Sequence, residues 1–302
     1  MEPTRLGEIA ALGTALLWTA TYLQFTFAVR RIGAPALNRL RLTFALGFLL
    51  IAHIAVFGIV LPVSQELAGW AWLTLSGVVG FAISDALLFR GLYHLGAHRT
   101  SLIMSLIPLV SALLAWALFG ERLSWVQAFA ALVTVGGITL VVSARQPKSE
   151  GEAAGLRIPR LGILFALGAV LAQSLRYILS LQGMKSGFAP LSANLVQILT
   201  ATTAVWIWSL VSKEKSPGFS SLRDRPAAAA TVGGAMTGPF LGVTLSMIAL
   251  SKAPVGIAST LMALSPVFLL FVSRWVFKEP ITVRAIVGTG LAVAGVAVLF
   301  LS

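Results

Sequence analysis

The chain has 302 residues, of which 58% are hydrophobic and 11% are charged. Soluble domains carry about 25% charged residues, so this chain has too few to cover a surface that faces water. With a mean hydropathy of +0.92, the composition excludes a soluble enzyme, a disordered chain and a fibrous repeat, and it leaves a polytopic membrane protein. Cysteine is absent and only three histidines occur, so we expect no disulfide, no cofactor held by thiolates and no metal centre.

Long apolar runs follow one another along the whole chain, with no long polar domain between them. A helix that crosses about 30 Å of hydrocarbon needs about 20 apolar residues. The runs predict an all-α membrane protein with ten transmembrane helices, at 7–29, 37–60, 68–92, 97–119, 123–143, 160–184, 189–211, 227–250, 254–276 and 281–301. We expect the first run to stay as a span, because polar residues such as Gln24 interrupt it and no basic segment precedes a short apolar core.

Basic residues predict the orientation of these spans. One face of the membrane receives sixteen lysines and arginines, the other receives four, and Arg90 and Arg176 fall inside spans. The richer face carries Arg30, Arg31, Arg39, Arg41, Arg99, Arg145, Lys148, Arg157, Arg160, Lys213, Lys215, Arg223, Arg225, Arg274, Lys278 and Arg284, and the poorer face carries Arg5, Arg122, Lys185 and Lys252. The positive-inside rule places the richer face in the cytoplasm and both termini on the opposite side of the membrane.

The net charge of +12 is explained by this topology signal, because the basic residues lie in short loops between apolar runs. We therefore expect membrane lipid around the chain and no nucleic-acid partner.

The two halves of the sequence repeat each other. Leu6, Gly7, Ala11, Leu12, Gly13, Leu16 and Tyr22 match Leu161, Gly162, Ala166, Leu167, Gly168, Leu171 and Tyr177 at an offset of 155, and Gly80, Ser101, Met104, Leu106, Pro108, Phe119, Glu121 and Gly137 match Gly238, Ser259, Met262, Leu264, Pro266, Phe277, Glu279 and Gly295 at an offset of 158. Each half has five spans, so the second copy enters the membrane in the opposite direction. Inverted repeats of this kind are typical of secondary transporters, with the substrate held near the midplane. We predict repeats at 1–144 and 160–302, joined by a cytoplasmic linker at 145–159.

Each half resembles an EamA domain of the drug/metabolite transporter superfamily. The resemblance rests on Ser101-Leu-Ile-Met-Ser-Leu-Ile-Pro108 with Phe119-Gly-Glu121, and on Ser259-Thr-Leu-Met-Ala-Leu-Ser-Pro266 with Phe277-Lys-Glu279; glycine-rich final spans complete both copies. It covers nearly the whole chain and is specific for the superfamily but weak for the substrate. It implies a central cavity lined by the first, third, fourth, sixth, eighth and ninth spans. The ten-span form is most similar to bacterial exporters of amino acids and metabolites.

Prolines within three spans are candidate hinges. Pro108, Pro239 and Pro266 cannot donate to the carbonyl four residues earlier, which frees a backbone acceptor inside the membrane. A moving hinge and a static packing kink both fit this pattern. Glu121 and Glu279 end equivalent spans and are expected to cap the helices that follow.

Two charged residues lie deep in spans. Asp85 is the only acidic residue well inside a span, where a carboxylate costs about 2.5–3.5 kcal/mol, so it should face a cavity or a partner. It could accept a proton, hold a substrate ammonium or bond to a neighbouring helix. Arg176 could grip a substrate carboxylate through two parallel hydrogen bonds or extend towards the headgroups. Because the two residues lie on opposite sides of the midplane, we expect no direct ion pair between them.

Other residues on the expected cavity-lining spans complete the candidate substrate site. Aromatic side chains could stack on an apolar or aromatic substrate, although packing is an equally ordinary role for them. The candidates are Trp18, Tyr22, Tyr93 and Tyr177 among the aromatics and Ser101, Met104, Gln173 and Met262 among the others. His53 is expected to be a packing residue, and Arg90 to extend towards lipid headgroups.

These observations predict a secondary-active exporter of amino acids, with apolar or aromatic ones favoured, that works by alternating access. The alternative within the superfamily is a carrier of drugs or nucleotide sugars. The sequence has no G-x-x-x-x-G-K-[ST] loop for ATP, no catalytic set for an intramembrane enzyme and no filter motif for a channel. We expect a monomer with a small-molecule substrate and proton coupling.

Overall fold

The computed structural model describes residues 3–62, 66–119, 125–142, 160–212, 218–253, 258, 261–277 and 282–301. These residues form helices and contain no strand. The predicted linker at 145–159 and the expected helix caps Glu121 and Glu279 lie outside the described residues.

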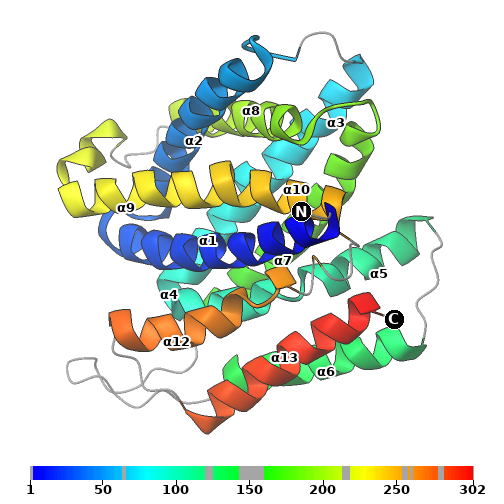
Figure 1. The fold of residues 1–302 in the computed structure, drawn as a ribbon. Helices are drawn as coiled ribbons and strands as arrows, with labels where there is room; N and C mark the ends of the chain where they lie inside the picture. Colours follow the sequence, from blue (N-terminus) through cyan, green and yellow to red (C-terminus); the bar gives the residue numbers. More distant parts are fainter. Residues whose placement is uncertain are drawn as a thin grey trace.

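The helices of each half follow the predicted spans (Figure 1). The first half contains α1 (Pro3–Ile32), α2 (Ala34–Phe57), α3 (Leu67–Gly77), η1 (Val78–Ser84), α4 (Asp85–Met104), α5 (Ile107–Phe119) and α6 (Trp125–Val142). The second half contains α7 (Arg160–Met184), α8 (Pro190–Val211), η2 (Phe219–Arg223), α9 (Arg225–Ala235), η3 (Met236–Gly242), α10 (Val243–Lys252), α12 (Ser265–Phe277) and α13 (Val283–Leu301).

Six helical stretches in the described part of the chain are long and apolar enough to cross a membrane, and shorter apolar helices accompany them. The third and fourth spans join into one long stretch, with a break at Gly96. Its φ of 78° lies in the left-handed region, which glycine adopts without strain. The elements therefore fit an all-helical membrane protein of ten spans, some of them built from two shorter pieces.

Pro108 and Pro266 begin new helices. The helix before Pro108 ends at Met104, and α5 starts at Ile107, so the proline is its second residue; Pro266 is likewise the second residue of α12. A proline in the first turn costs little, because that position has no intrahelical acceptor for an N–H group. Both spans are thus interrupted just before the proline, where the sequence predicted a bend half way along.

Irregular turns occur at equivalent places in the third span of each half. The segments η1 and η3 are π-helices of seven residues each, and they lie 158 positions apart, which is the offset of the sequence repeat. Pro239 lies inside η3. A π-helical stretch frees backbone groups from the regular ladder and often marks a functional site. The predicted irregularity at Pro239 therefore has a counterpart in the other half that contains no proline.

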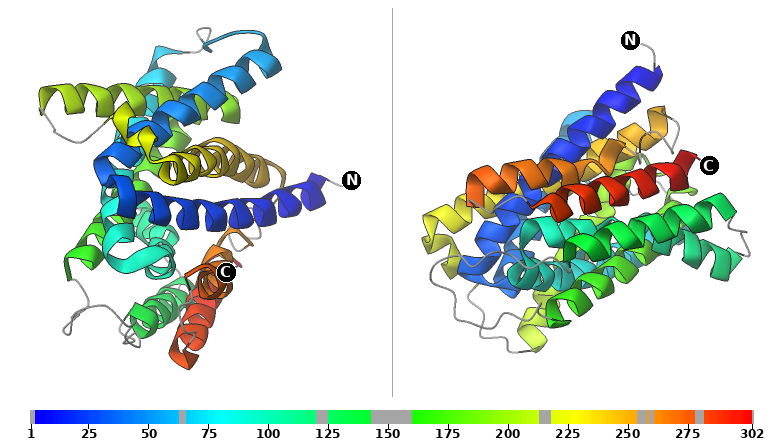
Figure 2. Two further views of the ribbon diagram at one scale, coloured as in Figure 1. Left: turned by 90° about the vertical axis from the view of Figure 1, so that its left-hand side faces the viewer. Right: turned by 90° about the horizontal axis from the view of Figure 1, so that it is seen from below.

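The packing repeats with the two halves exchanged. Helix α1 packs against α9, η3 and α10 of the other half, and α7 packs against α3, η1 and α4 in the same way. The equivalent helices α2 and α8 contact each other, as do α6 and α13. Figures 1 and 2 show α6 and α13 side by side at one end of the bundle, while α2 and α8 lie towards the other. This exchange is what a pseudo-two-fold relation between two repeats produces.

The last helices of the two halves meet through small residues. A Cβ atom on Gly137 would lie 2.5 Å from the backbone nitrogen of Ala292 and 2.5 Å from the carbonyl oxygen of Gly288. Small residues let two membrane helices approach this closely. The fifth and tenth spans therefore form a close seam at these glycines.

One exposed ion pair joins the two halves. Arg31 at the end of α1 donates from Nε to Asp224 Oδ2 at 2.8 Å. Asp224 also caps α9, because its Oδ1 accepts from the backbone N–H of Ala227 at 3.1 Å. The hydrogen bond from Arg31, and then that from Ala227, hold the pKa of Asp224 below its ordinary value of 3.8.

Gly137→Ala should destabilise the protein by about 1–3 kcal/mol, because the new methyl group would push the backbones of α6 and α13 apart. Thermal unfolding in detergent measures this. Gly136→Ala is the matched control, since a Cβ there meets nothing within 4 Å. Equal stability of the two variants would contradict the seam.

Asp224→Asn should make the unfolding temperature less sensitive to acid. A carboxylate whose pKa is lowered in the folded state stabilises it above the unfolded pKa of about 4, and loses that contribution as the pH falls through the folded value. Asparagine still caps the helix but has no charge to lose. Wild type should therefore lose more stability than the variant below about pH 4, in unfolding scans at stepped pH; parallel curves would contradict this.

Candidate functional site

A buried ion pair lies at the junction of η1 and α4. Asp85, the first residue of α4, is 8% exposed, and its Oδ2 lies 2.6 Å from Nη2 of Arg41 on α2. The sequence counted Arg39 and Arg41 among the basic residues of the richer face, at the start of the predicted span 37–60, and did not assign them to the site. Both belong to α2 and are buried; Arg39 donates to Ser209 and lies 5.7 Å from the ring of Trp206.

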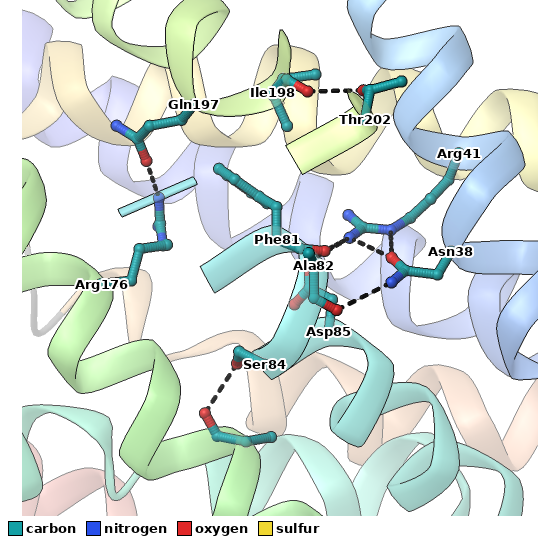
Figure 3. A network of polar contacts seen from close by, with 11 residues as sticks. Asn38, Arg41, Phe81, Ala82, Ser84, Asp85, Arg176, Gln197, Ile198 and Thr202 are labelled. Atoms are coloured by element: carbon teal, nitrogen blue, oxygen red, sulfur yellow. Dashed lines mark hydrogen bonds and ion pairs between the residues drawn. The ribbon is translucent and has the colours of Figure 1, made fainter. Parts of the chain in front are cut away.

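Polar groups of α2 and η1 complete the surroundings of Arg41. Its Nη2 donates to Asn38 Oδ1 at 2.8 Å and to the carbonyl oxygen of Phe81 at 2.8 Å (Figure 3). Asn38 in turn donates from Nδ2 to the carbonyl oxygen of Ala82 at 3.1 Å. The guanidinium carbon lies 5.0 Å from the ring centroid of Phe89. The π-helix thus provides carbonyl oxygens that hold Asn38 and Arg41 in place.

Arg176 on α7 is 2% exposed, and the contacts described for it are with neutral groups. Its Nη1 donates to Oε1 of Gln197 on α8 at 2.8 Å. With its amide turned so that Oε1 faces the guanidinium, Gln173 accepts from Nε at 3.1 Å and from Nη2 at 3.2 Å. The rings of Phe81 and Tyr177 lie 4.6 and 4.8 Å from the guanidinium carbon. Arg176 is therefore a buried cation held by amides and aromatic rings.

A glycine of the π-helix makes room for this arginine. A Cβ atom on Gly80 would lie 1.7 Å from Cδ and 2.4 Å from Cγ of Arg176. Only glycine allows the stem of Arg176 to cross η1 so closely. Gln197 is oriented by Ser180, which accepts from its Nε2 at 3.1 Å, and by Ser76, which donates to its Oε1 at 3.3 Å.

The described contacts contain no direct ion pair between Asp85 and Arg176. The carboxylate pairs with Arg41, and Arg176 acts on it electrostatically at longer range. Phe81 lies between the two cations, with the guanidinium carbon of Arg41 at 6.0 Å from its ring centroid. Tyr22 packs against the apolar cluster that contains Phe89, whose ring lies beside Arg41. We call Arg41, Phe81, Asp85 and Arg176 the charge cluster.

The contacts described for the other predicted site residues are with groups outside the charge cluster. Trp18 is half-buried and packs on η3, where its ring atoms lie 2.9 Å from the place of a Cβ on Gly242. Met104 and Met262 are buried, but in different apolar clusters. Ser101 is buried and donates to the carbonyl oxygen of His98 at 2.9 Å.

Tyr93 lies elsewhere. It is 54% exposed, and its ring packs edge-on against His94 at 5.3 Å. The structure therefore brings Tyr22, Gln173, Arg176 and Tyr177 to the charge cluster, and the described contacts do not bring Tyr93 there.

His53 and Arg90, which the sequence did not assign to the substrate site, make their described contacts outside the charge cluster. His53 is fully buried, with Nδ1 at 2.8 Å from the carbonyl oxygen of Ile59 and Nε2 at 2.9 Å from the hydroxyl of Ser192. Arg90 is exposed, and its guanidinium carbon lies 5.3 Å from the ring of Phe165.

Sequence reasoning missed Asn38, Arg41, Phe81 and Gln197. A basic residue near the start of an apolar run looks the same whether it belongs to a loop or to a helix. The available signal was spacing, because Asn38 and Arg41 are three apart on α2, and Asn194 and Gln197 repeat that spacing on α8. Residues three apart share a helix face.

The second half repeats the geometry without the charges. Asn194 donates from Nδ2 to the carbonyl oxygen of Pro239 at 2.8 Å, as Asn38 does to η1. A Cβ atom on Gly238 would lie 2.7 Å from Cγ2 of Thr21, which stands where Arg176 stands in the other half. Thr21 bonds to Thr237 at 2.8 Å. Only one of two equivalent crossings therefore carries an arginine.

Comparison with known proteins identifies the family. Residues 5–143 and 160–301 match the EamA-like transporter family. A probable terminal-alkyne amino-acid exporter of Streptantibioticus cattleyicolor is 28% identical over 131 residues, which cover 43% of either chain. An uncharacterized transporter of Synechocystis sp. is 34% identical over 80 residues, 26% of this chain and 24% of that one. The matched segments thus span less than half of each relative.

A solved crystal structure shares the fold. Its TM-score is 0.65 at 19% identity, over 98% of this chain and 96% of the other. The family match extends over both halves of the sequence, and the packing of those halves repeats with the two exchanged. The chain belongs to the EamA-like transporter family and is a multi-pass membrane transporter.

Proposed function

We propose that this protein is a secondary-active exporter of amino acids or related small metabolites, with apolar or aromatic ones favoured. The observation that carries the proposal is Arg176, a buried guanidinium with neutral partners at the contact between the two halves. A buried cation without a carboxylate is costly, so it is expected to serve a function. The rings of Phe81 and Tyr177 offer an apolar or aromatic side chain a surface beside it.

The alternative is a drug or nucleotide-sugar carrier of the same superfamily. The name of the Streptantibioticus relative supports the amino-acid proposal, because it describes a probable exporter of a terminal-alkyne amino acid. A single arginine between aromatic rings also suits a small carboxylate better than a bulky neutral drug.

Transport would proceed by alternating access between the two halves. The π-helices η1 and η3 cross the other half at Gly80 and Gly238, so a change in either segment would alter the contact between the halves. We propose these segments, with Pro239, and the interrupted spans before Pro108 and Pro266 as the hinges. The protein would act as a monomer in the bacterial inner membrane with both termini in the periplasm.

Proton coupling is proposed at Asp85. Protonation of this carboxylate would remove its ion pair with Arg41, and with it the link between α2 and α4. A proton taken up from the periplasm would therefore be tied to a rearrangement at the charge cluster.

A transport panel tests the function. Proteoliposomes containing the purified protein and loaded with one unlabelled amino acid should accelerate uptake of the same labelled amino acid, and apolar or aromatic ones should exchange fastest. Liposomes without protein are the control. If no amino acid or related carboxylate exchanges, the proposal is wrong. Exchange of drugs or nucleotide sugars instead would favour the alternative.

Arg176→Lys and Arg176→Gln should each lower this exchange at least tenfold. Lysine keeps the charge but loses the planar fork that binds a carboxylate with two hydrogen bonds. The measurement is initial counterflow at equal amounts of reconstituted protein. Arg90→Lys is the matched control, because Arg90 is exposed, and it should exchange like wild type. Normal exchange by Arg176→Gln would remove this residue from the site.

Asp85→Asn should abolish uptake driven by a pH gradient and leave counterflow, because exchange moves no net proton. It also leaves Arg41 buried without its partner, which costs about 3–5 kcal/mol. The double variant Arg41→Gln/Asp85→Asn removes both charges and keeps the test valid if the single variant fails to fold. Asp224→Asn is the control for a distant carboxylate. Gradient-driven uptake by the double variant would exclude Asp85 as the proton carrier.

A further inference from the structure

The charge cluster contains more positive than negative charge. Arg41 and Asp85 form an ion pair at 2.6 Å and neutralise each other, while Arg176 is held by Gln197 and Gln173, which are neutral. Among the described residues, Asp85 is the only buried carboxylate. The cluster therefore keeps one positive charge that the described chain does not balance.

This imbalance at Arg176 arises because Asp85 pairs with Arg41 and not with Arg176. Arg176 acts on Asp85 only electrostatically, and the ring of Phe81 lies 4.6 Å from its guanidinium carbon on the side of η1. Amide oxygens lower the cost of burying a cation but carry no compensating charge. A monoanion placed at Arg176 would bring the cluster to zero net charge.

The guanidinium has donors left for such an anion. An arginine carries five N–H groups. The described partners take three of them, from Nε and Nη2 to Gln173 and from Nη1 to Gln197. One N–H therefore remains on each terminal nitrogen, and these two can donate to both oxygens of one carboxylate. Because Arg176 is 2% exposed, a ligand reaches them only after the surrounding helices move.

A substrate ammonium would find no equivalent partner here. A zwitterionic amino acid adds no net charge, so the excess positive charge would persist. Its ammonium would also have to take Asp85 from Arg41, which leaves Arg41 buried and unpaired. An acylated amine has neither problem, because an amide is neutral.

We propose that the site selects monoanionic carboxylates whose amine is absent or acylated, with an apolar or aromatic group, over the corresponding zwitterions. This inference rests on the proposed export function and narrows its substrate class. The carboxylate is bound by Arg176, and the apolar group lies against Phe81 and Tyr177.

Three compounds with the same phenyl ring test it in proteoliposomes near neutral pH. N-acetyl-L-phenylalanine is a monoanion, L-phenylalanine is a zwitterion and phenethylamine is a cation. The monoanion should exchange with a half-saturating concentration at least tenfold below that of phenylalanine, and phenethylamine should not exchange. In thermal unfolding of the purified protein, the monoanion should stabilise wild type most.

Arg176→Gln should lose the preference for the monoanion in the unfolding assay, and Arg90→Gln should keep it. Preference of wild type for phenylalanine, or equal preference, would overturn the inference and leave amino-acid export standing. A monoanion preference that survives in Arg176→Gln would overturn it too, because the anion would then bind elsewhere. Failure of all three compounds and of the amino-acid panel would overturn both the inference and the export function.

Discussion

The arrangement of charge in the centre of the bundle depends on the ion pair between Arg41 and Asp85. Both residues are buried, and removing either would leave a charge with no partner in a medium of low dielectric constant. The pair fixes α2 against the start of α4, and it occupies the carboxylate that Arg176 would otherwise attract. Arg176 is consequently left with amide and aromatic partners.

The π-helices give these side chains their positions. In η1, backbone oxygens of Phe81 and Ala82 accept from Arg41 and Asn38, and the absence of a side chain at Gly80 lets Arg176 cross. In η3, Pro239 and Gly238 do the same for Asn194 and Thr21. A symmetric framework thus carries an asymmetric set of charges, which suits a carrier that needs two similar conformations but one substrate site.

Much of this architecture could be predicted from the sequence. The thickness of the membrane sets the length of an apolar run, so the run lengths predicted the spans. The repeat predicted that the packing of one half would recur with the two halves exchanged. Asp85 and Arg176 stood out because charge is rare at that depth. The role of Arg41 could not be predicted, because the sequence does not distinguish a basic residue at a helix start from one in a loop. The seven-residue π-helices could not be predicted either, because hydropathy does not report which backbone groups pair. Of the two, only η3 contains a proline that could have indicated an irregular turn.

The shared register of η1 and η3 also bears on what one chain can carry that two identical chains cannot. The widened turn falls at the same position of both repeats, so it belongs to the repeat and not to one half of the chain. A dimer of identical five-span chains would present the same residue at both glycine crossings. With both repeats in one polypeptide, one crossing can hold an arginine while the other holds a threonine.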